Sequence, residues 1–286
     1  MLQGSYTPPN RYIQNMPELP EVETTRRGIA PALEGRCVAA IVVREPRLRW
    51  PIPASLAKRM QGQTIQNVSR RAKYLLLETE PGTAMVHLGM SGSMRIVTAA
   101  DAPETHDHFD IVTTHGDIVR FNDPRRFGSL LWAGKNPAEH PLLKKLGPEP
   151  LGPDFNGDYL WHSAQGRRVA IKQHIMNSKT VAGVGNIYAS EALFRAGIHP
   201  KRKAGRIILP RMEKLAAEIC AVLQEAIQQG GTTLRDYRGG DGKPGYFKQK
   251  LLVYERAGEP CKNCSAPIAH IAQGQRSTYY CKHCQR

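Results

Sequence analysis

The sequence lacks a hydrophobic run long enough to cross a membrane. Its apolar stretches, such as Tyr74-Leu75-Leu76-Leu77, are far shorter than the ~20 residues that a membrane-spanning helix needs. Residues 1–15 carry one charge, Arg11, and no continuous apolar core, which argues against a secretory signal or an organelle transit peptide. The sequence therefore predicts a cytoplasmic protein in which residues 1–15 are an unstructured extension.

The chain is also poor in acidic residues. Its 25 Asp and Glu face 40 Lys and Arg, a formal net charge of +15 over 286 residues, and the pI is near 9.7. This surplus favours a polyanionic partner, and nucleic acid is a better candidate than a membrane surface. The length allows two domains with cores of ordinary size, and there is no internal repeat.

Cysteines are few, and four of the six stand in two pairs at the end of the chain. Cys261 and Cys264 are separated by sixteen residues from Cys281 and Cys284, which is the spacing of a zinc ribbon. Four thiolates would close a tetrahedral site and leave no position for catalysis, so we expect one structural Zn²⁺. A disulfide framework is the alternative, disfavoured because the chain has no secretion signal.

The first half of the chain has one clear helix and several strands. A helical apolar face predicts a helix over 18–33, with Gly35 as its stop. Short strands separated by turn signals favour a sandwich or barrel over a βαβ fold. We expect strands at 38–43, 74–78, 85–87, 109–113 and 118–121, with a hairpin turn at 115–117.

The second half begins after a segment rich in proline and glycine, 144–155, which has the composition of a domain linker. Helical patterns follow, the third of them with Asn186 as a possible cap and Gly197 as its end. A glycine-rich stretch at 230–246 then leads to the cysteines. The expected helices lie near 158–165, 167–177, 186–196 and 210–229.

The segment Met16-Pro17-Glu18-Leu19-Pro20-Glu21 bears on chemistry. Inside a chain the proline nitrogen is an inert tertiary amide, whereas at an N-terminus it is a secondary amine. An α-amino group titrates near pH ~7.7–8, so roughly a tenth is neutral at pH 7 and can attack an electrophilic carbon to form an iminium. The structural alternative is that Pro17 only opens a helix with acids in its first turn.

Four more motifs suit a nucleic acid, although each also has a purely structural interpretation. The cations of Arg70-Arg71-Ala72-Lys73 suit phosphates, or form a solvated strand end. The loop of residues 87–94 could present Met90, or Met90 packs in a core. In the segment 121–128, Arg125 and Arg126 could read bases while Phe127 wedges between them, or the segment is a structural turn. The glycines of 181–189 could seat a phosphate at a helix N-terminus.

Taken together, these motifs resemble those of the formamidopyrimidine-DNA glycosylases, bacterial base-excision enzymes that remove oxidised purines such as 8-oxoguanine. The resemblance covers residues 16–286. It rests on PELPEVET, RRAKYLLLE, HLGMSGS, NDPRRFG, VAGVGNIYASEALF and the cysteine pairs, which stand in the family's order.

The resemblance implies a catalytic centre. The amine of Pro17 would attack C1′ of the damaged nucleotide and expel the base, and β- and δ-elimination would cut both flanking phosphodiesters. Glu18 would carry protons, and Glu21 would be an accessory acid of the pocket. Lys73 and Arg276 would complete the centre by gripping phosphates around the extruded nucleotide.

The resemblance also implies a DNA interface. His87 and Asn186 would bind phosphates, while Met90, Arg125 and Phe127 would fill the gap in the duplex, with Arg126 beside them. Lys172 matches a lysine implicated in handling the oxidised base. The loop at about 231–245 would close over that base.

The implied fold is α+β with two domains, an N-terminal β-sandwich with flanking helices and a C-terminal helix-two-turn-helix bundle with a zinc-finger β-hairpin. The partner would be duplex DNA with oxidised purines or abasic sites, bound by a monomer in the bacterial cytoplasm and thereby associated with the nucleoid. We expect an extension at 1–16 that is absent from the active form, a catalytic domain at 17–145, a linker at 146–155, a helix-two-turn-helix region at 156–255 and a zinc finger at 256–286.

The fifteen residues before Met16 depart from the family pattern, because Pro17 is no nucleophile while they remain. We expect translation to start at Met16, with that methionine removed. Two other functions stay open. An endonuclease VIII-like enzyme would act on oxidised pyrimidines, although PELPE and NDPRRFG argue against it. A non-enzymatic zinc-ribbon DNA-binding protein would leave Pro17 and Glu18 without a purpose.

Overall fold

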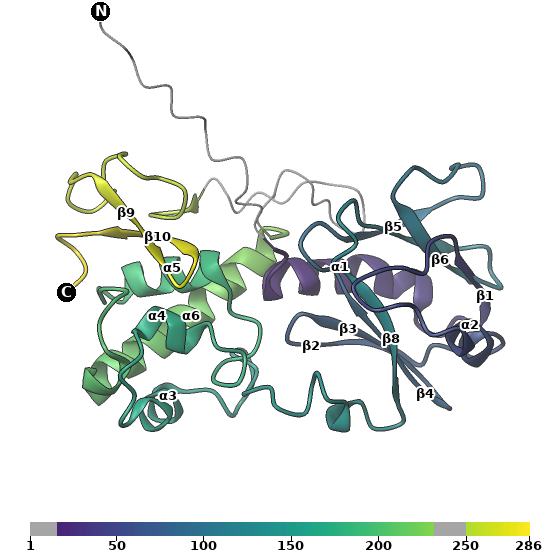
Figure 1. Cartoon of the computed structure of the whole chain (residues 1–286), viewed down its shortest axis with the longest axis horizontal. Coiled ribbons are helices and arrows are strands. Elements are labelled where there is room, and N and C mark those ends of the chain that lie inside the picture. The colour runs from purple at the N-terminus through teal and green to yellow at the C-terminus, as the bar shows by residue number, and fades with distance from the viewer. Residues whose placement is uncertain (1–15, 232–249) are drawn as a thin grey trace, which may run out of the picture.

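The computed structural model describes residues 16–231 and 250–286, which form a β-rich half and a helical half side by side (Figure 1). The expectations for residues 1–15, and for the loop beyond Gly231, fall outside the described residues. Within them, no helix is both long and apolar enough to span a bilayer. The predicted α+β class, with an N-terminal β-rich part and a C-terminal helical part that ends in a β-hairpin, is confirmed.

Two four-stranded antiparallel sheets build the β-rich half. One has the order β1-β6-β7-β5 and the other β2-β3-β4-β8. Their apolar faces and helix α1 share one core that includes Val22, Leu75, Val86, Phe109 and Phe121. The elements are α1 (Leu19–Leu33), β1 (Val38–Val43), α2 (Ser55–Met60), β2 (Asn67–Arg71), β3 (Tyr74–Thr79), β4 (Gly82–His87), β5 (Ser93–Val97), β6 (Asp107–Thr113), β7 (Ile118–Asn122), β8 (Ser129–Gly134) and η1 (Pro137–Glu139).

The sequence predicted α1 and five of these strands, and the 115–117 turn joins β6 to β7 with Gly116 at φ +90°. It missed α2, β2, β5 and β8. In β2 only Val68 is buried, so the strand shows no apolar alternation. The strand is stabilised by its pairing with β3, which its own sequence pattern does not indicate.

The helical half has a separate core. The expected helix over 167–177 is wrong in extent, because Ala170 forms a bridge with Lys203 and only 171–175 are helical. Helix α5 ends before Gly197, whose φ of +69° supports the predicted stop. The elements are α3 (Gly157–Ala164), α4 (Ile171–Ile175), α5 (Asn186–Arg195), η2 (Ala204–Arg206) and α6 (Leu209–Gln228).

A β-hairpin of β9 (Ile268–Gln273) and β10 (Arg276–Cys281) completes this half and lies beside α5 (Figure 1). Gly274 and Gln275 both have positive φ, +57° and +60°, as a two-residue type I′ turn requires. The turn places Arg276 at the tip of the hairpin.

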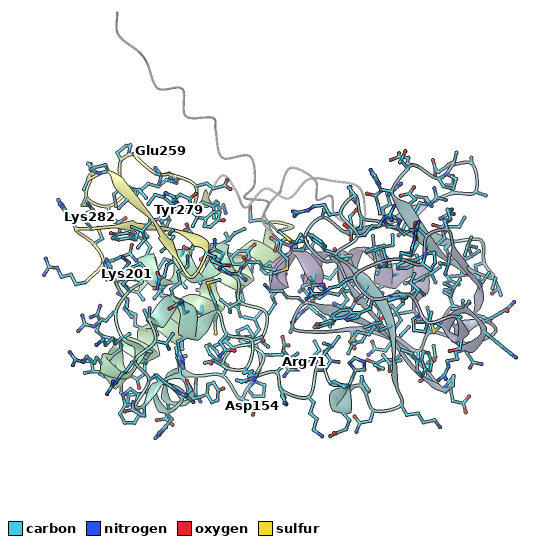
Figure 2. The ribbon with its side chains drawn as sticks, in the orientation of Figure 1. Arg71, Asp154, Lys201, Glu259, Tyr279 and Lys282 are labelled. Carbon is cyan, nitrogen blue, oxygen red and sulfur yellow. The ribbon has the colours of Figure 1, made fainter. Side chains whose placement is uncertain are left out.

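Residues 146–155 lead from one half to the other and are fastened to the β2–β3 turn. Glu149 accepts hydrogen bonds from Arg70 at 2.7 Å and from Arg71 at 2.8 Å, and Figure 2 shows Arg71 at this boundary. Arg70 also pairs with Glu23 at 3.2 Å. Both arginines are therefore paired with carboxylates of the chain, and Lys73 is the cation of this motif that stays a predicted phosphate contact.

Candidate active site and DNA interface

The start of α1 holds the peptide that follows Pro17 in a fixed position. Glu18 is the N-cap residue, and its backbone N–H donates to Glu21 Oε2 at 2.9 Å, which is half of a capping box. Pro17 itself is buried. Local helix chemistry therefore orients the residue that carries the predicted nucleophile.

The Glu18 side chain leaves α1 and binds the N-terminus of α5. Its Oε1 accepts a hydrogen bond from the Ile187 backbone N–H at 3.0 Å, and the N-cap residue is Gly185, so Asn186 is not the cap as expected. A Cβ on Gly185 would lie 2.2 Å from the Glu18 Cδ, which explains the glycine. The predicted phosphate seat at this helix end is occupied by a carboxylate of the chain itself.

The second Glu18 oxygen has no such anchor. Oε2 is buried and has no hydrogen-bond partner among the described residues. Burial raises the Glu18 pKa, while Lys73 and backbone N–H groups of α5 oppose that rise. One oxygen therefore fixes the carboxylate, and the other is available to take or give a proton.

Glu21 connects α1 to α5 and to the end of α6. Its Oε1 accepts a hydrogen bond from the Tyr188 hydroxyl at 2.6 Å, with both side chains buried. Gly231, at φ +82°, approaches so closely that an added Cβ would lie 3.2 Å from the same oxygen. Tyr188 was not predicted as a site residue, although it stands two residues after Asn186 in the VAGVGNIYASEALF motif.

Lys73 and Lys172 lie in the electrostatic field of Glu18. Burial lowers the Lys73 pKa, and the charge of Glu18 opposes that shift. Burial also lowers the Lys172 pKa, to about 7, with Glu18 opposing the shift and Arg276 adding to it. Four of the predicted site residues therefore act on one another electrostatically: Glu18 favours the charged form of both lysines, and Arg276 disfavours it.

The hairpin docks against α4 and α5 through the Ser277 carbonyl. This oxygen accepts from Lys172 Nζ at 3.1 Å and from Asn186 Nδ2 at 3.0 Å. Asn186 Nδ2 also donates to the Tyr254 hydroxyl at 3.3 Å, a neighbour that no sequence motif had singled out. Asn186 Oδ1 is buried and has no partner in the described part of the chain.

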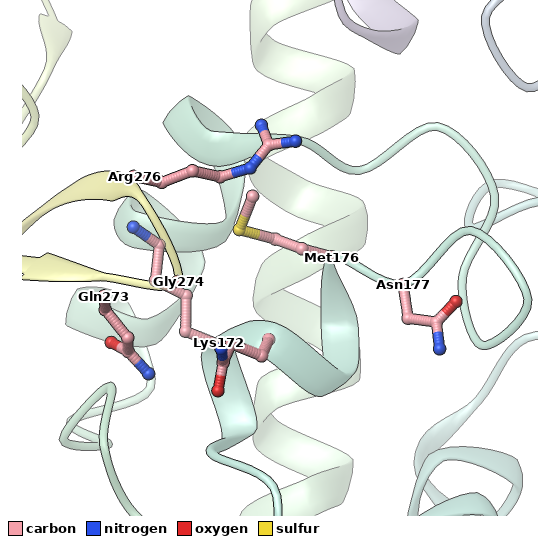
Figure 3. A pocket seen from close by; sticks show the side chains of 7 residues that line it. Lys172, Met176, Asn177, Gln273, Gly274 and Arg276 are labelled. Carbon is pink, nitrogen blue, oxygen red and sulfur yellow. The ribbon is translucent and has the colours of Figure 1, made fainter.

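A pocket of about 220 Å³ opens between α4 and the hairpin (Figure 3). Arg276 gives the pocket a positive charge, and Lys172, with a pKa of about 7, adds a partial one. Met176 and Asn177 lie at its α4 side. Its size and charge suit an anionic group such as a phosphate.

His87, at the end of β4, is a neutral group at pH 7. Burial lowers its pKa to about 4, with further contributions from Lys73 and Arg49. Its Nδ1 accepts a hydrogen bond from the Gly89 N–H at 2.9 Å, which leaves the proton on Nε2. His87 can therefore donate one hydrogen bond to a phosphate but brings no positive charge.

Two loops expected to fill a gap in DNA pack against each other at glycines. A Cβ on Gly89 would lie 2.4 Å from the Gly128 nitrogen, so only glycine permits this contact. The buried Asp123 links the loops further, accepting from Ser91 Oγ at 2.6 Å and from the Gly128 N–H at 2.7 Å. Met90 on the first loop is partly exposed.

At the tip of the second loop, Phe127 is 40 % exposed and the Arg125 guanidinium lies 4.7 Å from its ring centroid. Arg126 has a φ of +55° and turns back toward Glu45, at 3.4 Å. An exposed aromatic ring is costly in water, and intercalation between bases would give it an apolar environment.

Four cysteines gather beyond the hairpin. Their Sγ atoms all lie within 4.8 Å of one another, with 3.4 Å between Cys264 and Cys281. A tetrahedral zinc with Zn–S bonds of ~2.3 Å needs sulfurs a little under 4 Å apart, so the arrangement fits. The residues would hold one structural Zn²⁺, and its role would be to fix the base of the hairpin that carries Arg276.

Comparisons with known proteins show which family the chain is similar to. Family models match at residues 16–130 (formamidopyrimidine-DNA glycosylase N-terminal domain), 146–238 (its H2TH domain) and 258–286 (a zinc finger found in FPG and IleRS). The formamidopyrimidine-DNA glycosylase of Thioalkalivibrio sulfidiphilus is 59% identical over 272 residues, which are 95% of this chain and 100% of that protein. The chain belongs to the formamidopyrimidine-DNA glycosylase family.

Solved structures of this family have the same fold. Formamidopyrimidine-DNA glycosylase (MutM) from Thermus thermophilus superposes with a TM-score of 0.85 at 37% identity, covering 94% of this chain and 98% of that one. A mutant of the Lactococcus lactis enzyme, in complex with DNA containing Fapy-dG, gives 0.87 at 34% identity, with 94% and 100% covered. A Lactococcus lactis complex with abasic-site DNA gives 0.86 at 33% identity, with the same coverage.

Proposed function

We propose that this protein excises oxidised purines from duplex DNA and then cleaves the strand at the abasic site, with the nitrogen of Pro17 as nucleophile. The family is one of DNA glycosylases with AP lyase activity, and two similar structures hold DNA with a Fapy-dG or an abasic site. The observation that carries the assignment is the anchoring of the Pro17–Glu18 peptide by Glu21, beside a carboxylate with one unpaired oxygen.

In the proposed reaction the Pro17 nitrogen forms a bond to C1′ of the damaged nucleotide. The bond from C1′ to the base breaks, and the base leaves with the electron pair and takes up a proton. The nitrogen loses its proton, the sugar ring oxygen gains one as the ring opens, and an iminium joins Pro17 to C1′. Glu18 Oε2 is the group that we assign to these proton transfers.

Elimination then cuts the strand. The iminium acidifies C2′–H, and loss of that proton expels the 3′ phosphate. A second elimination expels the 5′ phosphate, so the sugar leaves the DNA. Neutral His87 and Asn186, together with the cationic Lys73 and Arg276, are the proposed phosphate contacts.

When the damaged base leaves the stack, protein side chains must fill the space that it leaves in the duplex. We assign that part to Met90, Arg125 and Phe127, supported by the glycine packing that joins their loops, and Arg126 to the flanking backbone. Lys172 is the proposed contact to the oxidised base or its phosphate, because it lines the anion-sized pocket together with Arg276.

The reaction requires Pro17 to be the first residue. The family model begins at residue 16, and relatives are matched over their full length by 95% of this chain, which supports an active form that starts at Pro17. Mass spectrometry of the protein from its native cell should find Pro17 at the N-terminus. Full lyase activity in protein that retains Met1 would disprove the mechanism.

Borohydride trapping tests the function itself. The mature protein is incubated with duplexes that contain 8-oxoguanine opposite cytosine, or an oxidised pyrimidine, and the adduct is reduced. A covalent adduct favouring the purine lesion is expected. A pyrimidine preference would indicate an endonuclease VIII-like enzyme, and no adduct with either duplex would indicate a DNA-binding protein without catalysis.

A further inference from the structure

A basic surface on the helical half has no part in the site described above. Two loops build it, residues 165–170 and 199–208, and backbone hydrogen bonds join them, from Ala204 to Val169 at 2.9 Å and from Gly205 to Arg167 at 3.0 Å. We call this region the distal basic surface. Its exposed cations are Arg167, Arg168, Lys201, Arg202, Lys203 and Arg206.

Nothing in the described structure neutralises these cations. None of the six forms an ion pair with a described carboxylate, whereas Arg70 and Arg71 each have such partners. Between residues 165 and 211 the sequence contains one acid, Glu191, and it is fully buried. The surface therefore attracts anions strongly.

Like charges are close enough to affect one another here. The Arg211 pKa is lowered by burial and then by the nearby Arg202. The His174 pKa is lowered by burial and then by Arg167. No described carboxylate offsets the repulsion between these positive charges. The surface is therefore suited to an external anionic partner.

Two large apolar side chains lie within the same loops. Ile208 is 61 % exposed, the highest value among the large hydrophobic residues described as exposed, and Val169 is 40 % exposed. Both residues adjoin η2: the Val169 carbonyl accepts a hydrogen bond from Ala204, the first residue of η2, and Ile208 stands two residues after the last. Phosphates offer no contact for such side chains, but a peptide with apolar residues does.

Figure 2 shows where one cation of the distal basic surface lies relative to the junction of the two halves. Lys201 projects from the edge of the helical half, on the side opposite the sheets, whereas α1 lies at the junction of the halves (Figure 2). A second copy of this chain is a poor occupant, because the same cations would face each other and the net charge is +15.

We propose that the distal basic surface binds an acidic peptide segment of another protein, one that carries bulky apolar residues beside its carboxylates. The carboxylates pair with the arginines and lysines, and the apolar residues cover Val169 and Ile208. Such contact would tether the enzyme to another protein through a surface that the proposed DNA contacts do not use. The proposal does not depend on the reaction that Pro17 performs.

Fluorescence polarisation with the full-length protein tests this. The probe is a labelled short peptide of Asp and Glu that carries Phe and Leu, and the reference is the same peptide with serine in place of both apolar residues. We expect the apolar probe to bind more tightly than the reference. Arg202→Glu/Lys203→Glu should weaken binding of both peptides by roughly tenfold or more, and Val169→Ser/Ile208→Ser should weaken only the apolar probe.

The matched control is Lys135→Glu/Lys145→Glu, an equal charge change at exposed positions of the β-rich half and the segment after it. It should leave peptide binding within about twofold, since exposed charges beyond a Debye length of ~8 Å are largely screened. Glycosylase activity should survive in all three variants. Equal binding of the two peptides, or equal loss in the control, would overturn the proposal. So would displacement of the probe by undamaged duplex together with weaker duplex binding in the Arg202/Lys203 variant, which would assign the surface to DNA.

Discussion

Replacing Glu18 by glutamine separates the two tasks of this side chain. The amide oxygen can still accept the Ile187 hydrogen bond that now measures 3.0 Å to Oε1, so the contact between α1 and α5 should persist. The unpaired Oε2 becomes an amide nitrogen that cannot exchange a proton with the reacting sugar. Glu18→Gln should therefore fold normally and lose catalysis.

The size of the loss follows from the role. A positioned general acid or base contributes typically ~10²–10⁴ in rate, so base release from 8-oxoguanine DNA should slow by that factor while DNA affinity changes little. Glu18→Ala also removes the carboxylate oxygen that accepts the Ile187 N–H at the N-terminus of α5. It should cost about 0.5–2 kcal/mol of unfolding free energy in addition to the same catalytic loss.

The charge of Glu18 also makes the stability depend on pH. Because burial raises its pKa in the folded protein above the ordinary value, its favourable contribution is complete below the unfolded pKa and is lost as pH rises through the folded pKa. Glutamine does not titrate, so its contribution to the unfolding free energy does not change with pH. The unfolding free energy of Glu18→Gln should therefore improve relative to the native protein from pH 5 to pH 8.

Single-turnover kinetics with excess enzyme and urea unfolding at several pH values measure these effects. Tyr159→Phe is a suitable control, since it removes a hydroxyl that donates to the Thr180 carbonyl at 2.9 Å and has no assigned part in the reaction. It should keep the native rate and the native pH profile. A Glu18→Gln variant with a native rate of base release would refute the proton-transfer role of Glu18. A difference in unfolding free energy that does not change with pH would refute the raised pKa of Glu18.

Further expectations concern the cations, the wedge and the zinc. Lys73→Ala should reduce the slope of log binding constant against log salt by about one, whereas His87→Gln should leave that slope unchanged at pH 7 because His87 is neutral there. From pH 7 to pH 10 the native protein should gain unfolding free energy relative to Lys172→Met, since the folded amine with a pKa of about 7 has lost the proton that the unfolded chain retains; a constant difference would contradict this. Phe127→Ala should change stability by less than about 0.5 kcal/mol yet slow base release at least about tenfold, as single-turnover assays would show. Chelation should release about one zinc per chain and weaken damaged-DNA binding through Arg276, and unchanged affinity after complete metal loss would exclude that link.

The fold was predictable where a segment carries its own pattern. The 18–33 helix has an apolar stripe and a glycine stop, and the 38–43 strand is a run of apolar residues, so both were recognised. The β2 strand was not recognised, because its pattern is polar. Its arginines are held by Glu149 and Glu23, which lie in distant parts of the chain. Helix α4 was expected to be longer because its first residues instead pair with Lys203 across an irregular bridge.

The site was predictable as a set of residues but not as a set of contacts. Motif order selected Glu18, Glu21 and Lys73, and the structure places Glu18 within the electrostatic field of Lys73. No local pattern could show that the Glu18 carboxylate caps a helix that begins at residue 186, or that Tyr188 bonds to Glu21. Such contacts depend on how two halves dock, and sequence spacing carries no information on that.

That docking makes the catalytic centre a property of both halves at once. The start of α1 belongs to the β-rich half, yet three successive contacts tie it to the helical half. The Leu19 N–H donates to the Gly183 carbonyl at 3.2 Å, Glu18 accepts from Ile187 and Glu21 accepts from Tyr188. Two of these three contacts use the carboxylates of Glu18 and Glu21, which the proposed reaction needs. A shift between the halves would therefore displace the proposed proton carrier and, at the same time, release the peptide after Pro17. Since a misplacement of ~1 Å can cost about 10²-fold in rate, duplex DNA that binds both halves is in a position to control the nucleophile as well as the lesion.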